Sequence, residues 1–463
     1  MVALTWACGS SSDSITEDTA AERAGDPSRM GDAEIVHDLR RQLARMVEED
    51  RFSGTVLFAK HGRPLFAQAY GLASRAFGAK VELDTKFNMA STAKLFTSIS
   101  VLQLAGEGKL SLDDALSAVL PDYPNQDVAR RVKIGQLLAM TSGLGDYVSL
   151  KMLEGNPERL RRIEDYLPFF VNDPLRFEPG TQQAYSNAGF LVLGLVVERL
   201  SGQRFEEYVR THIFEPAEMA HSGFYAFQDD IPNLALGYTR ATEPGAPLTV
   251  ALRLGRGASA AGGTGTYTTV EDLLRFAQAI QAGRLLDRKY TDLLMRYSPT
   301  EMWHLNGFEQ DYARGIHITG HGGATSGTST RLSMYPDLGY TVAVLSNYDG
   351  GARLVGDRLE ARLTGEPTPR AISVSEDVFQ AFAGSYVDGG LQPIVISVDR
   401  RGALFVAIPL QGKHKFVPLS SDEFFDDDML TPRLRFTRDG GGTVTGLVLS
   451  GIGREPIKAS KQP

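Results

Sequence analysis

Strand-like segments on both sides of a long, mostly helical stretch constrain the fold of this chain more than any other feature. Residues 54–59 and 64–70 are separated by a His-Gly turn, and residues 329–335 and 340–345 are joined by Pro-Asp-Leu-Gly. Residues 91–294 between them are dominated by helical periodicity and long loops. We therefore expect an α+β domain whose first and last strands share one antiparallel sheet, flanked by helices and a large helical subdomain.

A change in composition after residues 364–369 (Thr-Gly-Glu-Pro-Thr-Pro) marks a linker. The chain beyond it consists of short alternating strands separated by Asp- and Gly-rich turns, which is typical of a small antiparallel β-barrel. The sequence predicts three parts: a disordered tether over residues 1–33, a main domain over residues 34–365 and the barrel over residues 366–463.

Ser91 and Lys94 stand one helical turn apart at the start of an apolar, helix-like stretch. Residues three apart on a helix lie on one face, so the lysine can reach the serine. The N-terminus of a helix also favours the negative charge that develops when a serine hydroxyl attacks a carbonyl. The pattern indicates acyl transfer, and the plainer reading is a helix cap beside a solvated lysine.

Two further motifs follow in the chain, Tyr-Ser-Asn at residues 185–187 and His-Gly-Gly at residues 321–323. Tyr185 is a second candidate to take the serine proton, and Asn187, two residues on in an extended segment, would lie on the same side. Glycines in a strand edge let a ligand approach the backbone closely. A loop that anchors a helix, and a structural histidine, are the plainer readings.

In this order, the three motifs resemble those of the serine β-lactamase and penicillin-binding-protein superfamily, specifically its class C β-lactamase-like branch of esterases and D-aminopeptidases. The resemblance covers about residues 34–365. The C-terminal strands resemble the lipocalin-like domain of some aminopeptidase-like members, which implies a role in capping the site or in assembly. In the main domain, residues 87–90, 134–144, 177–180 and 262–276 also resemble the class C β-lactamase-like branch.

Two positions depart from the pattern of that branch. Met140 stands where a histidine is usual, which removes any hydrogen bond made there. His321 begins a His-Gly-Gly motif in place of the Lys-Thr-Gly of dedicated β-lactamases. The second departure resembles the esterase and aminopeptidase members and makes strong β-lactam hydrolysis unexpected.

Ser91, Lys94 and Tyr185 are the predicted catalytic residues. Ordinary lysine and tyrosine side chains both have pKa values near ~10, so one of them must be perturbed before it can accept a proton at pH 7. We expect Lys94 and Tyr185 to titrate as a unit, with Lys94 holding a Tyr185 phenolate that takes the Ser91 proton. The sequence does not decide which of the two is the formal base.

Asn187, His321, Gly323 and Ala324 are the predicted substrate-binding residues. Asn187 would bind Lys94 or a substrate amide, and His321 would contact the substrate or Tyr185. The resemblance implies that the oxyanion is held by the backbone N–H groups of Ser91 and Ala324.

Composition excludes several other classes of protein. The chain has 48 basic and 56 acidic residues and a net charge of -8, which argues against nucleic acid as a partner. Neither a metal-ligand motif nor a dinucleotide or phosphate-binding motif is present, so no metal or cofactor is expected. Acidic runs such as residues 426–428 are most simply interpreted as solvated surface.

The N-terminus allows two interpretations. Cys8 is the only cysteine, and a Ser-, Asp- and Glu-rich stretch follows it. This pattern resembles the end of a bacterial lipoprotein signal, which predicts a lipid anchor at Cys8 and a periplasmic or membrane-anchored protein. The basic and apolar parts of such a signal are incomplete, so the alternative is an exposed thiol on a cytoplasmic protein.

The sequence thus predicts a serine hydrolase that forms an acyl-enzyme on Ser91 and hydrolyses a small peptide, amide or ester. A cell-wall-type peptide containing D-amino acids is the first substrate expected. The alternatives are a true β-lactamase or DD-peptidase, and a catalytically silent relative that binds or regulates a partner.

Overall fold

The computed structural model describes residues 30–147, 160–225, 229–240, 247–251, 260, 265–295, 307–387, 393–399, 403–408, 412–451 and 456–462. Cys8 and its predicted lipid anchor lie outside these residues. No helix in the described ranges has the length and apolar character needed to cross a membrane.

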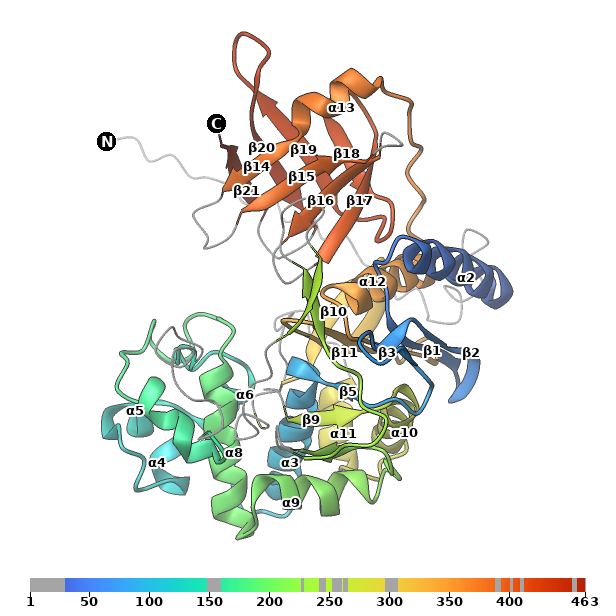
Figure 1. Cartoon of the computed structure of the whole chain (residues 1–463). Helices are drawn as coiled ribbons and strands as arrows, with labels where there is room; N and C mark the ends of the chain where they lie inside the picture. Colours follow the sequence, from blue (N-terminus) through green and yellow to red (C-terminus); the bar gives the residue numbers. More distant parts are fainter. Residues whose placement is uncertain are drawn as a thin grey trace, which may run out of the picture.

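A six-stranded antiparallel sheet in the order β10-β11-β12-β13-β1-β2 forms the centre of the main domain (Figure 1). Its strands are β1 (Gly54–Lys60), β2 (Arg63–Tyr70), β10 (Glu309–Ala313), β11 (Ile316–Thr325), β12 (Thr328–Tyr335) and β13 (Tyr340–Ser346). β1 pairs with β13 from Gly54–Ser346 to Lys60–Tyr340, so segments almost 290 residues apart in the chain lie side by side. The predicted α+β fold with a sheet shared by the first and last strands is confirmed.

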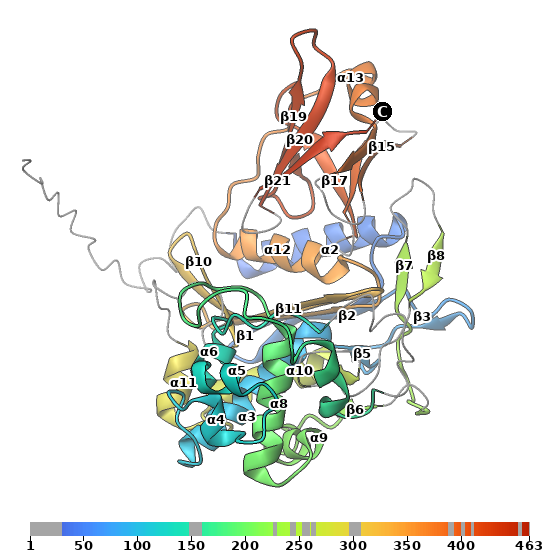
Figure 2. The ribbon, with the colours of Figure 1, turned by 90° about the vertical axis from the view of Figure 1, so that its left-hand side faces the viewer.

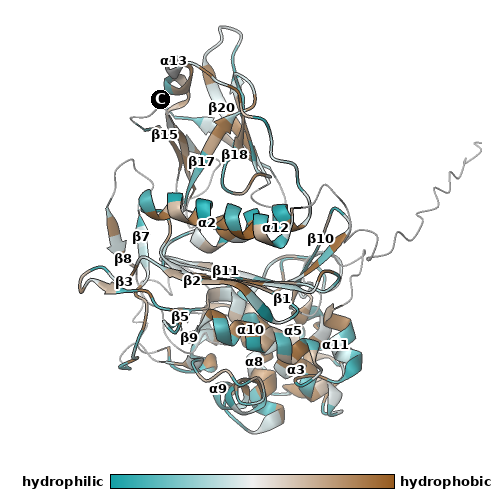
Figure 3. Ribbon diagram, turned by 90° about the vertical axis from the view of Figure 1, so that its right-hand side faces the viewer, coloured by the Kyte–Doolittle hydropathy of each residue, from teal (hydrophilic) through white to brown (hydrophobic). Residues whose placement is uncertain are grey.

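Helices cover both faces of this sheet (Figure 2). One face carries α2 (Asp32–Glu48) and α12 (Gly351–Leu363), which pack on it through an apolar cluster that includes Leu39, Val56 and Leu359. The other face carries α10 (Val270–Gln281) and the helical subdomain, whose central helices α3 (Lys94–Gly106) and α8 (Asn187–Ser201) are almost entirely buried and mostly hydrophobic (Figure 3). The remaining helices there are η1 (Ala90–Ala93), α4 (Leu116–Val119), α5 (Gln126–Arg131), α6 (Ile134–Leu138), η3 (Ile163–Phe169), α9 (Phe205–Val209), η4 (Arg210–Phe214) and α11 (Arg288–Met295).

Small sheets of two or three short strands connect the helical region to the main sheet. They are β3 (Leu72–Ser74) with β4 (Ala79–Lys80), β9 (Thr266–Thr268) between β5 (Phe87–Asn88) and β6 (Gly223–Phe224), and β7 (Tyr238–Arg240) with β8 (Leu248–Val250). β5 leads directly into η1, so its pairing with β9 fixes where the Ser91 turn begins.

The C-terminal part is a closed antiparallel barrel of eight strands, preceded by the short helix α13 (Glu376–Phe382). Its strands are β14 (Gly384–Val387), β15 (Ile394–Val398), β16 (Leu404–Ile408), β17 (Gly412–Pro418), β18 (Glu423–Asp426), β19 (Arg433–Arg438), β20 (Val444–Ser450) and β21 (Ile457–Lys461). Phe382 of α13 stacks on Phe436 with ring centroids 3.9 Å apart, so side chains fill this part of the barrel. The predicted C-terminal barrel is confirmed, whereas its likeness to lipocalins stays a prediction.

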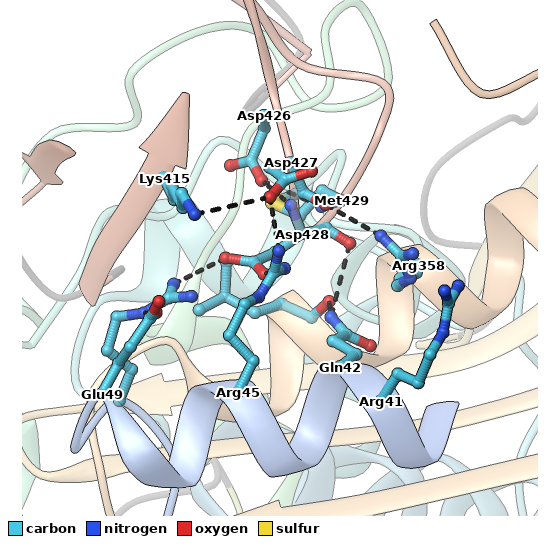
Figure 4. Close-up of polar contacts among 12 residues, drawn as sticks. Arg41, Gln42, Arg45, Glu49, Arg358, Lys415, Asp426, Asp427, Asp428 and Met429 are labelled. Carbon is cyan, nitrogen blue, oxygen red and sulfur yellow. Dashed lines mark hydrogen bonds and ion pairs between the residues drawn. The ribbon is translucent and has the colours of Figure 1, made fainter. Parts of the chain in front are cut away.

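The barrel is docked on α2 and α12 by the loop that follows β18 (Figure 4). Asp428 is fully buried and accepts hydrogen bonds from Arg51 at 2.6 Å and from Arg45, while Arg358 donates to the Asp427 carbonyl at 2.8 Å. The interpretation of residues 426–428 as solvated surface is wrong. Arginines of the main domain pair with Asp427 and Asp428, and His414 of the barrel pairs with Asp426, which is what allows these carboxylates to be buried.

Candidate active site

Ser91 lies in a tight turn that aims it at the edge of the sheet. The residue before it, Ala90, has a φ of +46°, in the left-handed region that side chains rarely adopt. Asn88 Oδ1 accepts a hydrogen bond from the Ala90 N–H at 2.8 Å and so holds this conformation. Strain of this kind persists where the surroundings impose it, and it is often found at reactive residues.

Lys94 is the first residue of α3 and is fully buried below Ser91. Its Nζ donates to Ser91 Oγ at 3.1 Å and to Asn187 Oδ1 at 2.7 Å. The predicted one-turn spacing therefore brings nucleophile and amine into direct contact.

Tyr185 is the second side chain that contacts Ser91 Oγ. Its hydroxyl donates to Ser91 Oγ at 2.7 Å, and its ring centroid lies 5.0 Å from Lys94 Nζ. The residue after it, Ser186, caps α8 by accepting from the Gly189 N–H at 3.0 Å. Asn187 is consequently the first residue of a helix, not part of an extended segment as expected, because the serine side chain favours a helix start there.

Burial perturbs the two candidate bases in opposite directions. It lowers the pKa of Lys94 to about 7, against the opposing effect of the carboxylates of Asp146 and Glu309. It raises the pKa of Tyr185 above its ordinary value. Both shifts have one cause, since a low-dielectric site disfavours the ammonium and the phenolate alike. At pH 7 a large fraction of Lys94 is thus a neutral amine beside a protonated phenol, and burial opposes the phenolate expected from the sequence.

Strand β11 passes so close to the Ser91 turn that only glycine fits at one position. A β-carbon on Gly323 would lie 2.7 Å from the Met89 carbonyl oxygen and 3.0 Å from the Ser91 nitrogen, whereas one on Gly322 would have no neighbour closer than 3.9 Å. Thr330 of β12 fastens the turn by donating to the Met89 carbonyl at 2.8 Å. This close approach brings Ala324, the next residue on β11, to the wall of the cavity at Ser91.

His321 is buried in the sheet, where its Nδ1 donates to the Gly322 carbonyl. Burial, helped by the nearby charge of Lys94, lowers the pKa of His321 to about 3. The ring is therefore neutral at physiological pH, and it adds no fixed charge to the site. The predicted contact of His321 with the substrate or Tyr185 stays a prediction.

Two carboxylates complete the site and were not predicted. Asp146 accepts a hydrogen bond from Asn187 Nδ2 at 2.7 Å, which orients the Asn187 oxygen toward Lys94. Glu309, at the start of β10, accepts from the Gly322 N–H at 3.1 Å. Neither residue belongs to a motif, so only the folded arrangement reveals them.

A cavity of about 820 Å³ opens at Ser91. The cavity is lined by Ser91, Tyr185, Asn187 and Glu309 of the main domain and by Thr431 and Gly451 of the barrel. The barrel therefore contributes to the wall of the cavity that holds the nucleophile. Among the described residues, no cluster of His, Cys, Asp or Glu is placed to hold a metal ion.

Comparison with known proteins shows which family this chain belongs to. Residues 39–366 match the family model described as Beta-lactamase. The chain is 27% identical over 413 residues to a penicillin-binding protein of Bacillus subtilis strain 168, covering 82% of this chain and 88% of that protein. This chain belongs to the beta-lactamase family, whose members include serine hydrolases.

Solved structures agree with this assignment. A penicillin binding protein from Bacillus halodurans is 34% identical, with a TM-score of 0.61 over 68% of this chain and 98% of that chain. A D-amino acid amidase from Ochrobactrum anthropi SV3 shares the fold at 20% identity, with a TM-score of 0.59 over 72% of this chain and 95% of its own. The predicted membership of the β-lactamase and penicillin-binding-protein superfamily is confirmed, while the assignment to a class C-like type stays a prediction.

Proposed function

We propose that the chain is a serine hydrolase that forms an acyl-enzyme on Ser91 and hydrolyses a small peptide, amide or ester. The observation that carries the proposal is the pair of hydrogen bonds to Ser91 Oγ, from Lys94 Nζ at 3.1 Å and from the Tyr185 hydroxyl at 2.7 Å. A serine is a poor nucleophile until a neighbouring group accepts its proton, and here two titratable groups touch it.

Lys94 is the base in the proposed acylation step. With a pKa of about 7, a large fraction of Lys94 is neutral at pH 7, and its amine accepts the Ser91 proton as Oγ attacks the substrate carbonyl. The oxyanion that forms is held by the backbone N–H groups of Ser91 and Ala324. Asn187, oriented by Asp146, keeps the amine next to Ser91.

Tyr185 is the acid in the same step. Its hydroxyl, kept protonated by burial, gives its proton to the departing nitrogen or oxygen as the bond to the carbonyl carbon breaks. The ammonium of Lys94 then returns a proton to Tyr185. In deacylation, water attacks the ester on Ser91, Lys94 accepts the water proton, and Ser91 Oγ recovers a proton as the product acid leaves.

The substrate to try first is an amide of a D-amino acid or a short peptide that contains one. The fold shared with a D-amino acid amidase suggests only the compound class for the first trial. The neutral His321 also favours an amidase or esterase over a β-lactamase, because no fixed cation faces the site from the third motif.

A panel of substrates tests the proposal, with Ser91→Ala as the control. We expect wild type to release product from the amides of D-alanine or D-phenylalanine, or from p-nitrophenyl acetate, and the variant to release none. Rapid turnover of benzylpenicillin, or a persistent penicillin adduct, would instead favour the β-lactamase or DD-peptidase alternative. Equal binding by wild type and Ser91→Ala without any turnover would favour the silent relative.

A further inference from the structure

Glu309 occupies the open edge of the strand that borders the nucleophile. β10 pairs with β11 only from Glu309–Gly320 to Ala313–Ile316, so residues 321–325 of β11 have no neighbour on that side among the described strands. The Gly322 N–H points to this open edge, and Glu309 Oε2 accepts it at 3.1 Å. The carboxylate therefore lies where a bound substrate would run along the strand.

Glu309 acts electrostatically on the buried Arg331, although that arginine is already paired with Asp357 and Glu360. The other oxygen of Glu309 lies 3.6 Å from His321 Nδ1, which is bonded to the Gly322 carbonyl, and the Glu309 side chain is 37% exposed. In the described residues it forms no ion pair with Lys or Arg. The two arginines of the cavity wall, Arg331 and Arg353, are both paired with Asp357 of α12, at 3.0 and 3.3 Å.

The field of Glu309 reaches the groups that handle the leaving group. It opposes the loss of a proton from Tyr185 and favours the charged form of Lys94. Glu309 lines the same cavity as Ser91 and Tyr185, and Tyr185 protonates the leaving group there in the proposed mechanism. A negative charge there would be repelled and a positive charge attracted.

We infer that Glu309 is a specificity residue that selects substrates whose leaving group is neutral or cationic and rejects those whose leaving group carries a carboxylate. The inference rests on the proposed function and narrows its substrate class. Ammonia, amines and alcohols, which are the leaving groups of simple amides and esters, fit the site, whereas a C-terminal amino acid, which leaves with its carboxylate, does not.

Three acetate esters with one acyl group and different leaving-group charges test this inference. They are 3-(trimethylammonio)phenyl acetate, phenyl acetate and 3-acetoxybenzoate. All three give the same acetyl-enzyme, so the ratio of their kcat/KM values reports acylation alone. The esters differ in intrinsic reactivity, but this difference cancels when the same kcat/KM ratio is compared between wild type and a variant.

In wild type we expect the kcat/KM ratio of the cationic to the anionic ester to exceed the ratio of their uncatalysed hydrolysis rates. Added salt should lower this kcat/KM ratio. Glu309→Gln should lower this ratio about tenfold or more. Asp311→Asn is the matched control, because Asp311 lies on the same strand and lines the same cavity, and it should change the ratio by about twofold at most. Glu309→Asp keeps the charge and should keep the direction of the preference.

An unchanged ratio in Glu309→Gln, with Ser91 still acetylated, would overturn the inference and leave the proposed function standing. A ratio that falls equally in Asp311→Asn would also overturn it, since a general negative potential would then be responsible. Failure of all three esters to acetylate Ser91, measured by intact mass, would overturn the proposed function and this inference together.

Discussion

Gly323 and Ser91 are so close that a β-carbon on the glycine would lie 3.0 Å from the serine nitrogen. That nitrogen is one of the two donors proposed for the oxyanion, so the spacing of β11 and the Ser91 turn sets the width of the oxyanion hole. Any side chain at position 323 must push the two segments apart.

Gly323→Ala should therefore lower kcat about 100-fold or more with little change in KM, because a displaced oxyanion donor costs transition-state stabilisation. Steady-state kinetics on an ester substrate measures this. Gly322→Ala is the matched control, since a β-carbon there has no neighbour closer than 3.9 Å and should be tolerated. Equal losses in both variants would contradict a specific role for the close approach.

The pH dependence of kcat/KM separates the two candidate bases. Since burial lowers the pKa of Lys94 to about 7, activity should rise with pH through about 7 as the amine becomes neutral, then stay level until Tyr185 deprotonates above its ordinary value of 10. A rate profile from pH 5 to 11 measures the rise and the plateau. Activity that instead keeps rising through pH 10 would favour a Tyr185 phenolate as the base.

The burial of Lys94 should also lower the stability of the fold. A lysine whose pKa is lowered from 10.5 to about 7 binds its proton more weakly in the native state than in the unfolded chain, so wild-type stability rises with pH between those values. Lys94→Met removes this cost, and we expect it to abolish activity and raise the free energy of unfolding at pH 7 by about 2 kcal/mol.

Urea unfolding of wild type and Lys94→Met at pH 7 and pH 10 measures the effect. The difference between the two proteins should shrink at pH 10, where the lysine of the folded wild type is neutral and the pH approaches the ordinary pKa of 10.5 that applies in the unfolded chain. A variant less stable than wild type at both pH values would show that the hydrogen bonds to Ser91 and Asn187 outweigh the burial of the amine.

The barrel's attachment depends on one buried carboxylate. Asp428→Asn leaves Arg51, which is 4% exposed, with Glu49 as its remaining charge partner, and should lower the free energy of unfolding by about 3 kcal/mol. Asp427→Asn is the control, because Asp427 is 26% exposed and its loss should cost under about 1 kcal/mol. Chemical denaturation followed by near-ultraviolet circular dichroism measures both; equal costs would mean that the buried pair does not hold the barrel in place.

Much of the fold was predictable because its signals are local. The His-Gly turn between β1 and β2, with His61 and Gly62 both at positive φ, and the strands β12 and β13 on either side of a Pro-Asp-Leu-Gly turn are readable from periodicity and turn residues. The residues now found around Ser91 were predictable for a similar reason. Lys94 lies one helical turn away, and Tyr185 and Asn187 belong to a compact motif.

What the sequence did not reveal depends on distant partners. The burial of Asp428 requires Arg51, which is 377 residues away in the chain, so an acidic run looks like solvated surface when read alone. Glu309 and Asp146 meet the site through loops and strand ends that no spacing rule connects. The ionisation of Tyr185 follows from how deeply the fold buries it, which a motif does not encode.

Covalent labelling of the nucleophile tests the central claim most directly. Folded wild type and Ser91→Ala would be incubated with a serine-directed fluorophosphonate, weighed intact by mass spectrometry and mapped by peptide digestion. We predict one adduct per wild-type chain, located on Ser91, and none on the variant. An adduct elsewhere, or a folded wild-type protein that stays unlabelled, would contradict an acyl-transfer role for Ser91.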